Sequence, residues 1–344
     1  MPMMNKHKMF SETPFEYKLR LIRGHADGTL DADWNEINEL LGGHQNPDHL
    51  RKVAKGIMEY DAYLHSEGGT SHRILALSDF HVPFQVPMGT FSKYAVRIDT
   101  LVLNGDIVDM QAISRFPKTY RVSPIEELIE ARQYIIDLVR MLKPAQVILI
   151  DGNHEKRFEA YLAKNLDSSV AELMPSSAME LVAIDGFHHY QRATGTKLYY
   201  EPLRDLLIED GIDVVYAGNW HYKIGSVIFA HPLAYSTAML KTAEKAAQYF
   251  FRVDRDFKTI VMAHTHKLGM FVQGGVTLIE QGCCCCTEKM NYSDGKLFLP
   301  QQKGYCYLEL DANANLKADS LKMEQIDLES EVTTREANIV ENCG

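Results

Sequence analysis

The sequence contains no uninterrupted apolar run that approaches the roughly 20 residues a helix needs to cross a lipid bilayer. Its first residues, MPMMNKHKMFSETPFEY, also lack the apolar segment of a secretory signal peptide. No internal repeat is present, and the only low-complexity tract is a run of four cysteines. These absences lead us to expect a cytoplasmic protein with no membrane partner.

Positive charge is also scarce, because 36 Lys and Arg residues face 46 Asp and Glu residues and give a formal net charge of −10. An acidic chain has no overall attraction to nucleic acid, so any DNA binding would need a local basic patch. The hydrophobic content of 46% is ordinary for a soluble globular protein. A chain of 344 residues can form one large domain and a small module.

Six cysteines are present, and four of them are adjacent at positions 283–286. Neighbouring residues of a strand point to opposite faces, so the whole run cannot reach one metal ion. The spacing also lacks the paired C-x-x-C pattern of a zinc site. We therefore interpret Cys283–Cys286 as a buried strand that uses cysteine as a small hydrophobic residue.

Residues 1–70 are predicted to form a small helical module. Asp33, with Glu36 three residues later, is typical of a helix start, and Gly42 follows the end of that helix. A second helix begins at Asn46 and has apolar residues at helical spacing. Two short helices joined by a glycine turn indicate a helix-turn-helix candidate.

The second of these helices carries a local basic patch in an otherwise acidic chain. We treat these residues as candidate DNA contacts, and the open alternatives are a solvated helix face and a dimerisation module that would make the protein a homo-oligomer. The patch consists of His49, Arg51, Lys52 and Lys55.

Residues 71–328 show apolar runs of strand length that alternate with helical segments. The runs are RILALSD, TLVLNGD, QVILIDGN, SVIFAH and TIVMAHTH, and GVTLIEQG, GYCYLELD and ADSLKMEQI follow as consecutive sheet strands. Ser123, Pro124 and Glu126 predict a capped helix that stops before Pro144, and a second helix is expected over about 237–253. This alternation predicts an α/β domain, followed by an acidic flexible tail over residues 329–344.

Five of the predicted strands end in side chains that can bind a metal ion. A single histidine at such a position would be interpreted as structural, but ligands of α/β sheets lie beyond the carboxyl ends of the strands, where these groups would meet. Carboxylate and imidazole groups without thiolate favour Mn, Fe, Zn or Ni, and two such ions can activate a water molecule. The residues are Asp79, His81, Asp106, Asp109, Asn153, His154, His231, His264 and His266.

The ordered blocks D-F-H at 79–81, G-D-I-V-D at 105–109, G-N-H-E at 152–155, His231 and H-T-H at 264–266 resemble the calcineurin-like metallophosphoesterases. The resemblance covers about residues 73–311 and is nearest to the DNA-repair exonuclease and phage phosphoesterase branch. It implies a four-layer αββα sandwich of two mixed sheets and two divalent transition-metal ions, with Mn²⁺ preferred and Fe, Zn or Ni as alternatives. The N-terminal module is also similar to small helical modules of phage-encoded proteins, which implies a bacterial or phage-infected host cell.

Carried over to this sequence, the resemblance implies a role for each residue of the blocks. His154 would protonate the leaving oxygen, and Asp109 would hold its imidazole in the productive tautomer. One ion would be bound by Asp79, His81 and His266, the other by Asn153, His231 and His264, with Asp106 bridging the two.

The sequence indicates the type of reaction more clearly than the class of substrate. Protein serine/threonine phosphatases have an arginine and a glycine where this chain has Met110 and Gln111, and that arginine clamps a phosphate monoester. Arg115 and Arg157 are nearby in the sequence, but we interpret both as solvated surface residues. We therefore favour a phosphodiesterase or nuclease acting on DNA. The alternatives are a phosphatase acting on a protein or small molecule, and a DNA-binding regulator with an inactive core.

Overall fold

A computed structural model describes residues 6–8, 13–27, 29–44, 46–66, 71–114, 122–233, 236–254, 256–289 and 301–327. The chain divides into two compact units, Met1–Ser71 and His72–Gly344. Within the described ranges, none of the helices combines the length and apolarity that a membrane span requires. The predicted acidic tail, residues 329–344, lies outside the described residues.

The first unit contains three helices, α1 (Pro14–Asp27), α2 (Trp34–Leu40) and α3 (Pro47–Ser66). The predicted cap of α2 is confirmed, because the Asp33 carboxylate accepts hydrogen bonds from the backbone N–H groups of the next turn. Helix α1 was not predicted from the sequence. It completes a small core in which Leu21, Ile37 and Leu50 are fully buried.

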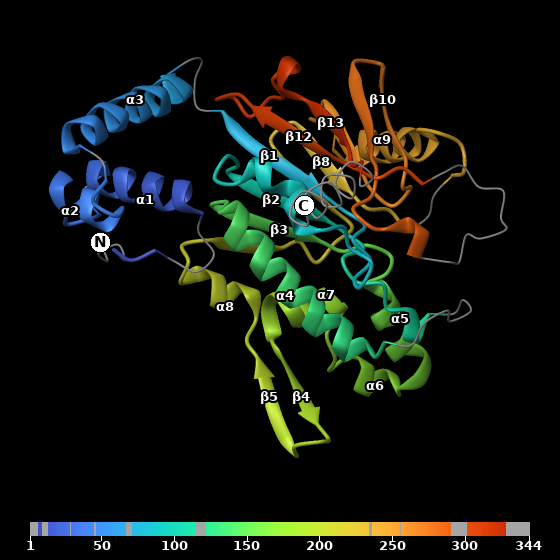
Figure 1. Ribbon diagram of the computed structural model, residues 1–344. Coiled ribbons are helices and arrows are strands. Elements are labelled where there is room, and N and C mark those ends of the chain that lie inside the picture. Colours follow the sequence, from blue (N-terminus) through green and yellow to red (C-terminus); the bar gives the residue numbers. More distant parts are fainter. Residues whose placement is uncertain are drawn as a thin grey trace, which may run out of the picture. The chain divides into compact units, whose positions relative to one another are not determined.

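The second unit is built on two large sheets (Figure 1). In the first sheet β1, β2, β3 and β6 are parallel, and in the second β8, β9 and β11 are parallel. In sheet order, the first contains β13 (Lys322–Gln325), β12 (Gly304–Leu310), β1 (His72–Leu77), β2 (Thr100–Asn104), β3 (Gln146–Ile150) and β6 (Asp213–Tyr216). The second contains β10 (Leu268–Gln273), β11 (Val276–Gln281), β9 (Thr259–Met262), β8 (Val227–Ala230) and β7 (His221–Ile224).

Helices connect and cover these strands, and a separate hairpin projects from the unit (Figure 1). The hairpin consists of β4 (Phe187–Gln191) and β5 (Thr196–Tyr200). The described helices are α4 (Pro124–Leu142), α5 (Lys156–Asn165), α6 (Ser168–Ala171), α7 (Ala178–Glu180), α8 (Leu203–Ile208) and α9 (Lys241–Val253).

Alternation of side chains along the strands produces four layers. Leu75 of β1 faces the core that α4 covers, whereas Ile74 points the other way into the core between the two sheets. Phe229 of the second sheet enters that central core from the opposite side, and Ile228 packs beneath α9. The order helix, sheet, sheet, helix confirms the predicted αββα sandwich.

Several details differ from the sequence prediction. The strand ADSLKMEQI begins at Lys322, and the second long helix begins at Lys241, so both are shorter than expected. We expected the last three strands to follow one another in a sheet, but β11 belongs to the second sheet while β12 crosses over to pair antiparallel with β1. The capping box of α4 is confirmed, because Ser123 and Glu126 exchange side-chain and backbone hydrogen bonds.

Candidate metal centre

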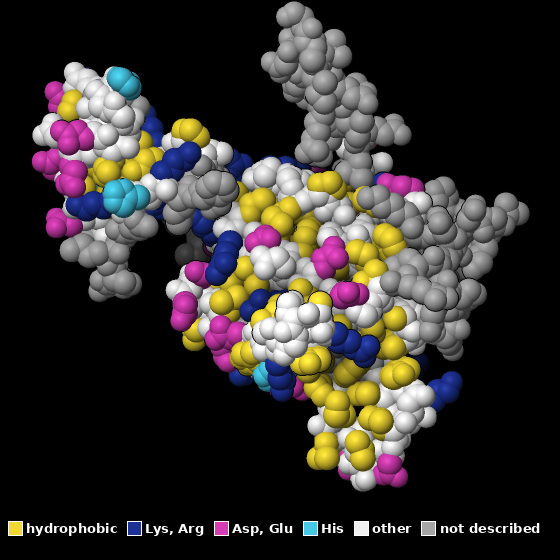
Figure 2. Space-filling model, turned by 60° about the horizontal axis from the view of Figure 1, so that its bottom comes forward, with side chains coloured by type: hydrophobic (Ala, Val, Ile, Leu, Met, Phe, Trp, Pro, Cys, Tyr) yellow, Lys and Arg dark blue, Asp and Glu magenta, His cyan; other side chains and the backbone are white. Residues whose placement is uncertain are grey.

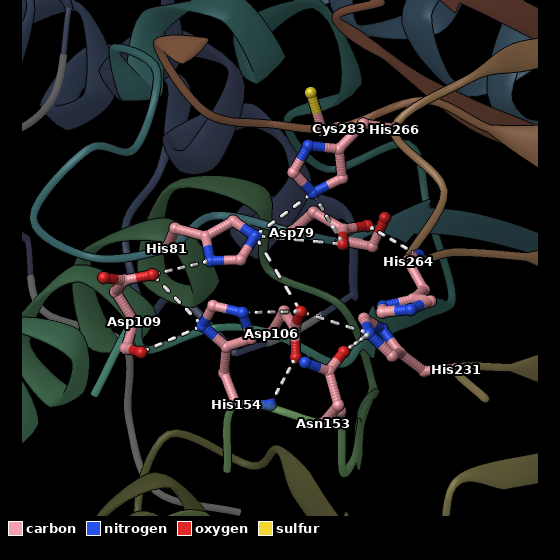
Figure 3. Close-up of polar contacts among 12 residues, drawn as sticks. Asp79, His81, Asp106, Asp109, Asn153, His154, His231, His264, His266 and Cys283 are labelled. Atoms are coloured by element: carbon pink, nitrogen blue, oxygen red, sulfur yellow. Dashed lines mark hydrogen bonds and ion pairs between the residues drawn. The ribbon is translucent and has the colours of Figure 1, made fainter. Parts of the chain in front are cut away.

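The carboxyl ends of strands from both sheets meet at one cluster of polar side chains (Figure 3). Loops after β1, β2 and β3 supply one part of it, and loops after β8 and β9 supply the other. All of the residues that the sequence predicted for metal binding and catalysis lie in this cluster, as their mutual contacts show. They are Asp79, His81, Asp106, Asp109, Asn153, His154, His231, His264 and His266.

At one end of the cluster, two imidazoles converge on a buried carboxylate. The Nε2 atoms of His81 and His266 lie 3.1 Å apart, and Nε2 of His266 lies 3.1 Å from Oδ1 of Asp79. The lone pairs of two ring nitrogens and a carboxylate repel one another at these distances. A cation bound between them removes this repulsion. Asp79, His81 and His266 are therefore able to hold a cation.

A second group lies beside the first. Oδ2 of Asp106 lies 3.3 Å from Nε2 of His231, which is 3.4 Å from Oδ1 of Asn153. His264 completes a group with Asp106 and His231 that can also hold an ion. Because Oδ2 of Asp106 is also 3.8 Å from Nε2 of His81, this carboxylate lies between the two groups.

Hydrogen bonds outside the cluster determine which ring nitrogen of a histidine faces inward. Nδ1 of His231 lies 2.8 Å from the backbone oxygen of Asn104, and Nδ1 of His81 lies 3.2 Å from Oδ1 of Asp109. Both partners accept hydrogen bonds, so Nδ1 carries a proton and Nε2 faces the cluster, where it can bind a metal ion once it is deprotonated. This arrangement fits a site for metal ions.

The backbone around the cluster is in an unusual conformation. Asp79, His81, Asp106, His264 and His266 all have positive φ angles, between 47° and 76°. Residues other than glycine seldom adopt this left-handed conformation, and it recurs at functional sites that the surrounding structure holds in place.

Two glycines allow the loops to approach one another. A Cβ atom at Gly152 would collide with the backbone and carboxylate of Asp106, and one at Gly105 would collide with the ring of His231. The close approach of the loops after β2, β3 and β8 therefore requires glycine at both positions.

Charges in the cluster shift the pKa values of its members strongly. Burial by itself would raise the pKa of Asp79, but the charge of His266 and a hydrogen bond from it lower that pKa to about 2. Burial by itself would lower the pKa values of His231 and His266. The nearby carboxylate of Asp106 nevertheless raises the pKa of His231 to about 9, and Cys283 and Asp79 raise the pKa of His266 to about 10. Burial and the charge of His231 lower the pKa of His264 to about 3.

His154 lies at the edge of the cluster rather than inside either ligand group. Its backbone N–H donates to Oδ1 of Asp106 at 2.9 Å. Its Nδ1 lies 2.9 Å from the backbone oxygen and 3.1 Å from Oδ1 of Asp109. Since both of these oxygens are acceptors, Nδ1 carries a proton, and Nε2 is the ring nitrogen that could give a proton to another molecule or take one from it.

The interpretation of Arg157 as a solvated residue was wrong. Its side chain is half-buried, with Nη1 donating to the backbone oxygen of Asp109 at 2.5 Å and Nη2 lying 2.8 Å from Nε2 of His154. Its position three residues after His154, close to the start of α5, is the signal that could have indicated this contact. Arg115 lies outside the described residues.

Glu155 is a second residue whose role was missed. Its buried carboxylate accepts hydrogen bonds from the backbone N–H groups of Asp106, Ile107, Val108 and Gly152, at 2.7–3.2 Å. Burial, together with the nearby carboxylates of Asp106 and Asp151, raises its pKa to about 7. One side chain thus joins the loop after β2 to the loop after β3.

A two-sheet sandwich with a cluster of Asp, His and Asn side chains at its strand ends is the arrangement of a metallophosphoesterase. The calcineurin-like phosphoesterase family model matches residues 72–268 of this chain, more than half of its length. The chain therefore belongs to the calcineurin-like phosphoesterase family. Among curated proteins, no significant match to the chain is found.

The solved structures that match this chain do so at low identity and low TM-score. Vps29 from Entamoeba histolytica in complex with zinc is 15% identical, with 74% of this chain and 98% of that chain covered at a TM-score of 0.36. An archaeal phosphodiesterase is 11% identical, with 74% and 99% covered at a TM-score of 0.35. A predicted phosphoesterase from Streptococcus pneumoniae is 10% identical, with 75% and 99% covered at a TM-score of 0.27.

Metal binding is expected to release protons. In the metal-free protein at pH 7, His231 and His266 hold protons because their pKa values are about 9 and 10, whereas His264 is neutral. A metal ion must displace these protons, so the affinity for Mn²⁺ should rise as the pH rises from 7 towards 9. Calorimetric titration in buffers of different ionisation enthalpy measures the release, and His231→Asn should reduce it. Binding without proton release at pH 7 would contradict this assignment.

Proposed function

We propose that this chain is a phosphoester hydrolase that uses two divalent metal ions and cleaves phosphodiester bonds in DNA. The observation that carries the proposal is the position of Asp106. Its carboxylate lies between two groups of metal-competent side chains, and the loop that contains it also positions the His154–Asp109 pair. A shared carboxylate with an adjacent proton donor is the arrangement that two-metal hydrolysis requires.

Each group would hold one ion. Bound ions would supply Lewis acidity, polarising the phosphoryl group and making a water molecule nucleophilic at neutral pH. The N and O donors suit Mn²⁺ and also Fe, Zn or Ni. Asp79, His81 and His266 would hold one ion, and Asn153, His231 and His264 the other, with Asp106 shared between them.

His154 would act as the general acid. Its Nε2–H would be transferred to the leaving oxygen as the P–O bond breaks, and the ring would become neutral. Asp109 would keep Nδ1 protonated and stabilise the imidazolium before the transfer. A protonated Nε2 cannot accept a hydrogen bond, so the Arg157 guanidinium would turn from His154 to a phosphate oxygen.

The surroundings of Asp109 favour a diester over a monoester. Met110 is fully buried, and Gln111 is buried and uncharged, so neither supplies the cationic clamp of a protein phosphatase. A diester carries one negative charge and a monoester dianion carries two, so a diester depends less on such a clamp. A phosphomonoesterase remains the second candidate function, because Arg157 could bind a terminal phosphate.

A DNA substrate is supported by the basic residues of α3. His49, Arg51, Lys52 and Lys55 are exposed, and Arg51 forms an ion pair of 3.4 Å with Asp48. On the face shown in Figure 2, Lys and Arg side chains are scattered among hydrophobic and acidic ones. The basic patch of α3 could add phosphate contacts that a chain with a net charge of −10 does not otherwise supply.

A substrate panel with the purified chain and added Mn²⁺ tests the function directly. It should compare single- and double-stranded DNA, RNA, bis-p-nitrophenyl phosphate, p-nitrophenyl phosphate and a phosphopeptide. We expect DNA and the diester to be cleaved faster than the monoesters. Preferential cleavage of the phosphopeptide or of p-nitrophenyl phosphate would favour the phosphatase instead, and no cleavage of any substrate would indicate an inactive core.

Metal dependence should follow from the shared carboxylate. Chelation should abolish hydrolysis, and Mn²⁺ should restore it better than Mg²⁺ because of the imidazole ligands. Asp106→Asn should lower kcat by more than about 100-fold, beyond the 10–100-fold typical of an outer hydrogen-bond partner. The matched control is Asp185→Asn, at an exposed position. Equal losses in the two variants would disprove the bridging role.

If His154 is the general acid, the rate lost on its substitution should depend on the leaving group of the substrate. His154→Asn should retain both metal ions and slow DNA cleavage by about 10²–10⁴-fold. The loss should be smaller on an activated nitrophenyl diester, whose leaving group needs no proton. Metal analysis is the control, because a loss of bound metal would make His154 a ligand rather than an acid.

The basic patch should matter only for DNA. Lys52→Ala/Lys55→Ala in the full-length chain should weaken DNA binding and reduce the slope of log affinity against log salt by up to about 0.9 per lost contact. Cleavage of bis-p-nitrophenyl phosphate should not change. The control is Lys143→Ala/Lys245→Ala, which removes two exposed lysines of the second unit. Identical salt slopes in both double variants would rule out DNA binding by this patch, and the oligomeric state of the variants would then test dimerisation.

A further inference from the structure

The cysteine run is buried as expected but does not form the expected strand, because its backbone bends at Cys284, and Cys283 and Cys285 form only isolated bridges. Backbone hydrogen bonds hold the run on both sides. The N–H of Cys284 donates to the oxygen of Ser78 at 2.9 Å, and the N–H of Cys286 donates to that of Phe84 at 2.7 Å. On the other side, the N–H of Cys283 donates to the oxygen of Gln302 at 3.0 Å. The side chains of the run are divided into two pairs of alternate residues.

The two pairs have different surroundings. Cys284 and Cys286 belong to the large core that α4 covers. Cys283 and Cys285 lie outside it and pack against Phe84 in a small separate cluster. The sulfur atoms of this second pair and a ring nitrogen of His266 all lie within 4.8 Å of one another. All four cysteines cannot reach one ion, as predicted from the sequence, but the alternate residues Cys283 and Cys285 can.

His266 presents a second ring nitrogen that the dinuclear cluster does not use. Nε2 is directed at Asp79 and His81, whereas Nδ1 is buried and has no hydrogen-bond partner among the residues that the structure describes. The residue is only 6% exposed, so solvent does not compensate Nδ1. Figure 3 places the Cys283 sulfur on the side of the ring opposite to the contacts with Asp79 and His81.

We propose that Cys283, Cys285 and Nδ1 of His266 form a binding site for one thiophilic metal ion, separate from the two ions of the hydrolytic centre. Two thiolates and an imidazole suit Zn²⁺, Cd²⁺ or Cu⁺ and do not suit Mn²⁺. In a zinc site with bonds of about 2.0–2.3 Å, the donor atoms lie roughly 3.3–4 Å apart. The observed group therefore has to contract by at most about 1.5 Å.

Sharing His266 connects this site to the hydrolytic centre. An ion at Nδ1 would fix the ring orientation that Nε2 needs to contact Asp79, and it would alter how strongly Nε2 donates its lone pair. The competing account is that Cys283 is an inert buried thiol, because its Sγ already lies 3.4 Å from the backbone oxygen of Gln302 as a weak donor.

Cadmium binding to the full-length protein tests the proposal. Cd²⁺ bound to thiolate gives a near-ultraviolet charge-transfer absorption that Cd²⁺ bound to carboxylate and imidazole lacks. After removal of metals with a chelator and equilibrium dialysis against Cd²⁺ under reducing conditions, absorbance and metal content are measured together. The test variant is C283S/C285S, and the matched control is C284S/C286S, which removes two cysteines of the same run from the opposite face.

We expect the wild-type protein and C284S/C286S to show the thiolate absorption and to bind one equivalent of Cd²⁺ more than C283S/C285S. The single variant C285S, which keeps Cys283 next to His266, should lose the absorption as well. Circular dichroism of each variant checks its folding, and C285S provides the answer if a double variant fails to fold. Absence of the absorption in the wild type, or its persistence in C283S/C285S or C285S, would overturn the proposal without affecting the hydrolytic function.

Discussion

Two buried carboxylates impose the main constraint on this structure. Asp79 and Asp106 are at most 1% exposed, and a buried charge is destabilising unless an opposite charge lies beside it. In the metal-free chain, protons on His231 and His266 supply that charge, and their raised pKa values follow directly. These protons therefore supply the positive charge that a bound metal ion would supply instead. The left-handed backbone of the ligand loops and the glycine at position 152 bring these groups together.

The same constraint explains why both sheets are needed. Loops of the first sheet provide the carboxylates, whereas loops of the second provide three of the histidines. The distance between the two sets of loops depends on the central core, where Val102 and Ile148 of one sheet meet Phe229 and Val261 of the other. A cavity in that core would therefore lower the free energy of unfolding and also displace His231 relative to Asp106.

Much of the fold could be predicted because its signals are local. Strand-length apolar runs, the capping box at Ser123 and polar residues at strand ends each depend on neighbouring positions, and parallel strands bring those ends together. The contact of Arg157 with the backbone oxygen of Asp109 depends on how the loops after β2 and β3 meet, which spacing does not reveal. The crossover of β12 and the division of Cys283–Cys286 into two pairs depend on pairing partners far away in the sequence. The β4–β5 hairpin was missed because only one face of it is partly buried.

Glu155 restricts how far the loops after β2 and β3 can separate. A single carboxylate accepts from backbone groups of two loops, so neither loop can open without breaking hydrogen bonds to the other. A substrate of the proposed hydrolysis would therefore be admitted by displacement of side chains, and the half-buried side chain of Arg157, in contact with His154, is one that could turn aside.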